Sequence, residues 1–209
     1  MQALFVHGMG RSPLSGWPLM ARLRAQGIRT HALGYATPFQ SFAAIRARLV
    51  RRIQALSAHG DYVLIGHSLG GVLLRAAVAA LPPSTPPPRH LFLLGSPIQA
   101  SRFAQNLQRN WLFRLLAGDC GQLLASPARM ALIGPVNAPT TSVAGTRGWK
   151  GRLNPFEGEL NDGIVSLTEI RADWITEEIC LPVIHTYLPS NKQVSEIIQA
   201  RLANLYVSA

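Results

Sequence analysis

The sequence predicts an α/β fold, a single domain whose sheet of six mostly parallel strands is covered by helices on both faces. Short apolar runs alternate with segments of helical periodicity along most of the 209 residues. Strands that alternate with helices form βαβ units, and these units build a parallel sheet. The residues are 48% apolar and 14% charged, as is typical of a globular chain, and the length suffices to bury a full core.

Each element follows from its local pattern in the chain. Six apolar runs are expected to be strands: residues 3–6, 28–35, 62–65, 89–97, 141–145 and 179–184. Four segments with helical spacing are expected to be helices: residues 15–27, 42–56, 69–81 and 190–206. The proline-rich stretch 82–88 fits neither a helix nor a central strand, and we interpret it as a loop within the one domain, 1–209. Residues 98–139 break the alternation, because they are apolar and helical in pattern without a strand.

The chain is strongly basic, with a formal charge of +10 from 18 Arg and 2 Lys against 10 acidic residues. Such charge is often found in proteins that bind nucleic acid or anionic membranes. In the densest cluster, "RARLVRRIQ" at 46–54, apolar residues recur at helical spacing, so the arginines are expected on the opposite, solvated face. No aromatic residues interleave with them as a stacking platform would need. We expect no nucleic-acid partner; peripheral contact with an anionic membrane is an open alternative.

The cellular setting is predicted from what the sequence lacks. No apolar run reaches the ~18 residues that a membrane span needs. The start, "MQALFVHGMG", has no basic region and cleavage site of a secretory signal. Two cysteines, Cys120 and Cys180, suggest no disulfide framework. We therefore expect a cytoplasmic protein; nothing in the sequence indicates its oligomeric state.

A serine flanked by glycines lies where the third expected strand meets its helix. "GHSLG" at 66–70 matches the G-x-S-x-G nucleophile elbow in its expected structural context. Such a turn would hold Ser68 in a strained conformation that presents Oγ to a substrate, and a side chain at Gly66 or Gly70 would clash. The following helix would direct its positive end to the same place. The alternative is a tight turn whose serine merely caps the helix, but the buried strand before it favours catalysis.

A serine nucleophile needs a base and a carboxylate that orients the base. In this arrangement the chain order is serine, acid, histidine. His185, at the end of the last expected strand, is the predicted base, and Asp162 in "NDGIV" is the predicted acid. Because Asn-Asp-Gly is also a common turn, Asp173 and Glu159 are the substitutes by chain order. His67 is expected to pack at the elbow rather than to act as base.

The tetrahedral intermediate also needs hydrogen-bond donors for its oxygen. The backbone N–H groups of Met9, in the glycine-rich "FVHGMG", and of Leu69 are the predicted donors. Each such donor stabilises a transition state by roughly 3 kcal/mol. A phosphate-binding loop is the rival interpretation of the glycine-rich segment, but the lysine of G-x-x-x-x-G-K-[ST] is missing. No metal or organic cofactor is implied.

Four segments, in this order, resemble the α/β-hydrolase family and within it the bacterial lipase and esterase group: "FVHGMG", "GHSLGG", "NDGIV" and "VIHTYLPSN". "GHSLGG" is also similar to the elbows of GPI inositol-deacylase-like enzymes, so this motif does not indicate which member of the family the chain resembles most. The resemblance implies an α/β-hydrolase fold reduced to six strands, because the strands that usually precede the oxyanion loop are absent. It supports Asp162 as the acid.

The resemblance also explains residues 98–139, which fall where the family inserts lids and caps. A small helical lid is therefore expected there. Phe103, Leu107, Trp111 and Leu115 recur at four-residue steps, giving an apolar face that covers an acyl-binding groove or rests on a lipid surface. In the first case Trp111 and Leu115 are expected to contact an acyl substrate. A helix that only completes the core is the alternative.

Together these features predict a serine hydrolase that cleaves carboxylic esters of acyl or lipid-like small molecules through an acyl-enzyme intermediate. A thioesterase or an amidase with the same triad is the alternative within enzymes. The alternative outside enzymes is a binding protein of this fold that has lost catalysis.

Overall fold

The computed structural model describes residues 1–151 and 154–207. Six strands form one sheet: β1 (Gln2–Val6), β2 (Arg29–Leu33), β3 (Tyr62–His67), β4 (His90–Leu94), β5 (Thr140–Gly145) and β6 (Glu177–Leu181). The strand order is β2-β1-β3-β4-β5-β6, and every neighbouring pair is parallel. The predicted α/β fold with six strands is confirmed, and the sheet of the described residues is wholly parallel.

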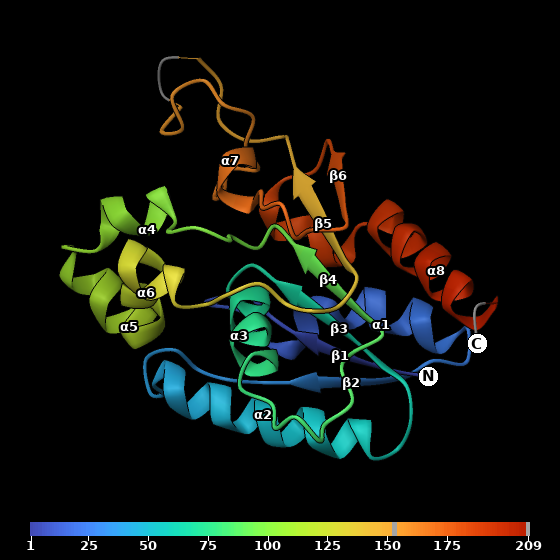
Figure 1. Ribbon diagram of the computed structural model, residues 1–209. Helices are drawn as coiled ribbons and strands as arrows, with labels where there is room; N and C mark the ends of the chain where they lie inside the picture. Colours follow the sequence, from blue (N-terminus) through green and yellow to red (C-terminus); the bar gives the residue numbers. More distant parts are fainter. Residues whose placement is uncertain (152–153, 208–209) are drawn as a thin grey trace.

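Helices cover both faces of this sheet (Figure 1). They are α1 (Trp17–Arg24), α2 (Phe42–Ser57), α3 (Leu69–Val78), α4 (Arg102–Leu107), α5 (Trp111–Ala125), α6 (Pro127–Ala131), α7 (Leu167–Ile170) and α8 (Lys192–Val207). Side chains alternate along a strand. In β1, Leu4 and Val6 pack in one core layer with α2 and α3, and Ala3 and Phe5 pack in the other with α1 and α8. Burial on both faces explains why the strands are nearly continuous apolar runs.

The last strand differs from its expected bounds. Residues 179–184 were expected as strand, but β6 covers Glu177–Leu181. Pro182 follows directly and has no N–H to donate to a neighbouring strand. The chain therefore leaves the sheet at Leu181 and soon enters the 3-10 helix η3 (His185–Ser190), which begins at His185.

The arginine-rich helix α2 has the apolar face that its sequence predicts. Its buried residues are Ile45, Leu49, Ile53 and Leu56. Arg46 and Arg51 are exposed, while Arg48 and Arg52 are half-buried and donate to Gly34 O and His31 Nδ1. The helix therefore stabilises the core, and its exposed arginines belong to a solvated face.

Three helices, α4, α5 and α6, fill the segment between β4 and β5, which the sequence marked as lacking a strand. Side chains of Ser101, Asn110 and Ser126 cap their N-termini. Figure 1 shows them grouped together, to one side of the sheet. No helix within the described residues is both long and apolar enough to cross a membrane.

Candidate active site

The turn between β3 and α3 holds Ser68 in an unusual backbone conformation, with φ 53° and ψ −125°. A positive φ is rare for a residue with a side chain and indicates local strain. Three hydrogen bonds fix it: Ser68 N donates to Leu94 O at 2.9 Å, and Ser68 O accepts from Gly71 N at 3.0 Å and from Ser96 Oγ at 2.8 Å. The neighbouring strand β4 thus supports the strained residue.

Glycines around Ser68 let the backbone pass close to itself. A Cβ on Gly66 would lie 2.4 Å from Gly71 Cα, and a Cβ on Gly70 would lie 2.1 Å from Val6 O. A Cβ on Gly71 would lie 2.3 Å from Ser96 Oγ, which is a side-chain atom. No real Cβ approaches backbone as closely as at Gly66 and Gly70, so the turn requires glycine at those two positions.

A buried carboxylate and imidazole meet beside this turn. His185 Nδ1 donates to Asp162 Oδ2 at 2.6 Å, and His185 N donates to Asp162 O at 2.9 Å. Asp162 Oδ1 accepts from the N–H groups of Ile164 and Val165, at 3.0 and 2.8 Å. With the proton on Nδ1, the Nε2 of His185 has its lone pair free to accept a proton.

Two further glycines make room for this pair. Gly95 follows β4 with φ +54°, and a Cβ there would lie 2.9 Å from Asp162 Oδ2 and 3.0 Å from His185 Nδ1. Gly145 ends β5, and its Cβ would lie 2.7 Å from Asp162 Cβ. Neither glycine belongs to a motif that predicts the site, although each directly follows or ends a strand.

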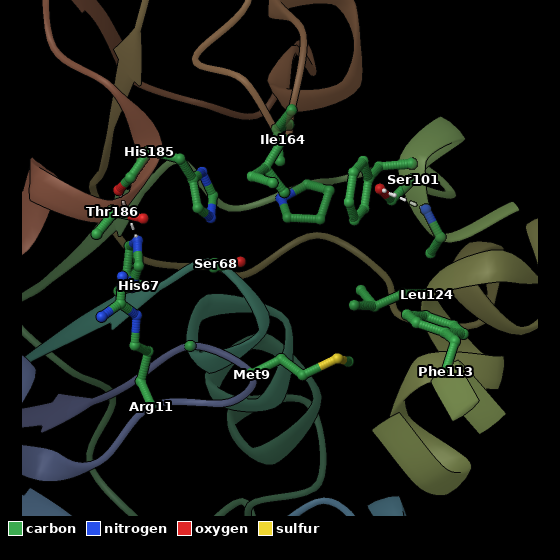
Figure 2. Close-up of a pocket in the computed structure, with 15 residues that line it drawn as sticks. Met9, Arg11, His67, Ser68, Ser101, Phe113, Leu124, Ile164, His185 and Thr186 are labelled. Carbon is green, nitrogen blue, oxygen red and sulfur yellow. Dashed lines mark hydrogen bonds between the residues drawn. The ribbon is translucent and has the colours of Figure 1, made fainter. Parts of the chain in front are cut away.

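Ser68 and His185 line one cavity of about 220 Å³, together with Gly8 and Met9 of the loop after β1 (Figure 2). A Cβ on Gly8 would lie 3.1 Å from Ser68 Cβ, so that loop runs directly past the serine. Leu69 follows the serine as the first residue of α3. No described residue forms a hydrogen bond with the Ser68 hydroxyl, so the serine and imidazole share a cavity without being bonded. Such contacts often tighten only when substrate binds.

His67 packs at the elbow, as expected. Its Nε2 donates to His185 O at 3.0 Å, and its ring centre lies 4.8 Å from that of His185. Burial holds the pKa of His67 well below the usual 6.5. A neutral ring whose Nε2 is already bonded supports the position of His185 rather than acting as a second base.

The loop that carries Met9 is held by the side chain of His7, for which the sequence predicts no role. His7 stacks on Tyr35 with ring centres 4.2 Å apart. His7 Nδ1 donates to Gly8 O at 2.8 Å, and its Nε2 accepts from Tyr35 N at 3.3 Å. Burial lowers the pKa of His7, and this favours the neutral tautomer that these two bonds need. The signal in the sequence was a histidine at the end of a buried strand.

The apolar wall of the cavity comes from the helices between β4 and β5. Phe103 of α4 and Phe113 and Leu124 of α5 line it. Trp111 and Leu115, which were expected to contact substrate, lie outside this cavity and are 73% and 60% exposed. Asn110 starts a new helix, so the four-residue steps do not form one continuous face. At about 100° per residue, Phe113 lies on the opposite side of α5 from Trp111 and Leu115.

The two substitute acids do not approach the imidazole. Asp173 is exposed, and Glu159 accepts from Arg102 Nη2 at 2.7 Å. The hydrogen bond from Arg102 lowers the pKa of Glu159 to about 2. Across the described residues, no three His, Cys, Asp or Glu side chains gather as a metal site would require.

Comparisons with known proteins agree with this architecture. The model of the alpha/beta hydrolase family matches residues 3–201. No protein of curated function gives a significant sequence match.

Solved structures are similar over nearly the whole chain. The mature lipase BlEst2 of Bacillus licheniformis is 17% identical with a TM-score of 0.73, covering 96% of this chain and 91% of its own. The thioesterase RedJ, from the prodiginine pathway of Streptomyces coelicolor, is 17% identical with a TM-score of 0.68, covering 96% and 88%. Tomato methylketone synthase I, complexed with 2-tridecanone, is 12% identical with a TM-score of 0.65, covering 98% of both chains. At these identities the likeness shows the fold alone.

The glycine requirement at the elbow can be tested by stability. We expect Gly66→Ala to lower the free energy of unfolding by about 2 kcal/mol or more, because the new methyl group would overlap backbone that cannot move aside cheaply. Gly134→Ala is the matched control, since a Cβ there meets nothing within 4 Å. That control should change stability by less than about 1 kcal/mol. Urea unfolding followed by circular dichroism measures both, and equal midpoints would contradict the requirement.

Proposed function

Because this chain belongs to the alpha/beta hydrolase family, we propose that it is a serine hydrolase that cleaves carboxylic esters of acyl or lipid-like small molecules. The observation that carries the proposal is the 2.6 Å hydrogen bond from His185 to Asp162 at the wall of the cavity that Ser68 also lines. The apolar lining of that cavity fits an acyl chain.

In the proposed reaction, Ser68 Oγ attacks the carbonyl carbon of the ester while His185 Nε2 takes the hydroxyl proton. Asp162 keeps the imidazole in the required tautomer and stabilises the imidazolium. His185 then gives the proton to the leaving group as the bond to it breaks. Water, activated by the same imidazole, hydrolyses the acyl-enzyme and frees Ser68.

The tetrahedral intermediates carry a negative oxygen, and the N–H groups of Met9 and Leu69 are the proposed donors to it. The passage of Gly8 beside Ser68 and the position of Leu69 at the N-terminus of α3 support this assignment. The His7–Tyr35 stack would keep the Met9 donor in place without rearrangement during the reaction.

We further propose that the chain acts as one domain in which residues 98–139 form a small helical lid. Phe103 and Phe113 would then contact the acyl chain. Trp111 and Leu115 would meet a lipid-like substrate only at a lipid surface, since both are exposed and neither lines the cavity.

A thioester or an amide could react by the same steps, because the machinery acts on any acyl carbonyl. The likeness of the fold to that of a thioesterase makes thioesters the first alternative to test. Comparison of p-nitrophenyl esters with acyl thioesters of equal chain length separates the two.

The nucleophile can be identified with a fluorophosphonate probe, which reacts with activated serines. We expect the wild type to be labelled and Ser68→Ala to be neither labelled nor active on p-nitrophenyl butyrate, with kcat reduced at least roughly 10³-fold. Ser101→Ala is the matched control, because Ser101 lines the same cavity without a proposed role in the reaction. Labelling of Ser68→Ala, or an unlabelled wild type, would refute the proposal.

The identity of the acid can be tested by removing its charge. We expect Asp162→Asn to lower kcat by roughly 10³- to 10⁴-fold, because an amide no longer holds the imidazole in the required tautomer. Asp173→Asn should retain wild-type kcat, since Asp173 is exposed and does not contact His185. Steady-state kinetics on p-nitrophenyl butyrate decides, after circular dichroism has shown that both variants fold. If the Asp173 variant were the inactive one, the acid would be wrongly assigned.

A further inference from the structure

The two sides of the cavity differ in chemistry. Phe103, Phe113 and Leu124 line one side, and Arg11 and Thr186 line the other, next to His67. Figure 2 shows the serine between these sides, with Arg11 extending toward the His67 ring. An ester that lies across Ser68 therefore meets apolar side chains in one direction and a cation in the other.

The position of the imidazole decides which part of the substrate lies on the cationic side. His185 must reach the leaving-group atom to return the proton, so the leaving group lies beside His185. The acyl chain then extends in the other direction, against the phenylalanines. Arg11 is thus on the side of the leaving group.

A second hollow adjoins the cavity at His185, which lines both. Its volume is about 290 Å³, and it shares Ile164, His185 and Thr186 with the first. Arg147 and Trp149 line it. A leaving group longer than a simple alcohol would extend from the first hollow past His185 toward Arg147.

Backbone hydrogen bonds fix the main chain of both arginines beside the two hollows. Arg11 N donates to Gly8 O at 3.3 Å in a turn where Gly10 has φ +64°. Arg147 N donates to Val183 O at 3.4 Å. Arg11 and His67 line the same cavity, and the Arg11 side chain extends toward the His67 ring (Figure 2).

Both guanidinium groups lack a counter-charge within the part of the chain that the structure describes. Arg102, Arg129 and Arg171 pair with carboxylates, but among the described residues Arg11 and Arg147 have no ion-pair partner.

The walls of the two hollows supply little negative charge. Asp162 is the one carboxylate among the described residues that line them, and His185 and two backbone N–H groups already engage its oxygens. One guanidinium group lines each hollow, and neither has an ion-pair partner among the described residues. Such groups suit a phosphate, whose oxygens they can bind in a bidentate manner.

We propose that the leaving group of the substrate carries a phosphate, which Arg11 and Arg147 bind while the acyl chain lies against Phe103 and Phe113. This inference rests on the proposed serine hydrolase function. The reaction is still hydrolysis: the bond from the acyl carbon to oxygen or sulfur breaks and water supplies the new C–O bond. The products are a carboxylic acid and an alcohol or thiol that keeps its phosphate.

Two matched substrate pairs test the proposal and distinguish the sources of the phosphate. One pair is S-octanoylpantetheine and its 4′-phosphate, and the other is 1-octanoylglycerol and its 3-phosphate. Within a pair, acyl chain and scissile bond are identical, so the ratio of kcat/KM reports on the phosphate alone. We expect the wild type to prefer the phosphorylated member of at least one pair by about tenfold. The preferred pair identifies the leaving group as a thiol or an alcohol.

Three variants link that ratio to the arginines. Arg11→Gln and Arg147→Gln should each lower it severalfold, while Arg51→Gln, on the exposed face of α2, should leave it at the wild-type value. In the wild type, raising NaCl from 50 to 500 mM should also lower the ratio, because salt screens exposed charges. The salt measurement uses only the wild-type protein, so misfolding of a variant cannot affect it.

The possible failures are distinguishable. A ratio near one in both pairs, or one that persists in both arginine variants, overturns the inference while hydrolysis of the neutral substrates leaves the proposed function standing. A fall confined to one variant overturns the assignment of the other arginine. Absence of hydrolysis of all four substrates, together with no fluorophosphonate labelling, overturns both the function and the inference.

Discussion

The close passage of backbone at the β3–α3 turn is the constraint on which the rest of the structure depends. Gly66 lies against Gly71, and Gly70 against Val6 O, so closely that no side chain fits at either position. This packing holds Ser68 at a positive φ, which costs about 1–3 kcal/mol that the buried strands around the turn must offset. Ser68 lines the cavity, and α3 begins at the next residue, Leu69.

The parallel sheet brings the other groups to this turn. Because all six strands run in one direction, the loops after β1, β3, β4 and β5 emerge at one edge. Asp162 lies in the loop after β5, and His185 begins the 3-10 helix after β6. The hydrogen bond between them joins these two segments. Gly95 shows how tightly this edge is packed, since any side chain there would displace the pair.

The strands and the turn at Ser68 could be predicted because they follow from local sequence patterns. Burial on both faces makes the strands apolar runs. The elbow is a short motif with steric requirements of its own, so the position of Ser68 at a strained strand-to-helix turn could be predicted. Contacts that depend on helix capping and tertiary packing could not be predicted from the sequence. Asn110 starts a new helix and thereby turns Phe113, rather than Trp111, toward the cavity. No spacing in the sequence tells which arginines line the hollows beside His185.

The central claim is that Ser68, the imidazole and the two backbone donors act on one carbonyl group. A crystal structure of the protein after reaction with p-nitrophenyl butylphosphonate tests it most directly. The account predicts phosphorus bonded to Ser68 Oγ, its oxygen within about 3 Å of both the Met9 and Leu69 nitrogens, and His185 Nε2 within hydrogen-bonding reach. An adduct on another side chain, or a phosphonyl oxygen turned away from both nitrogens, would contradict it.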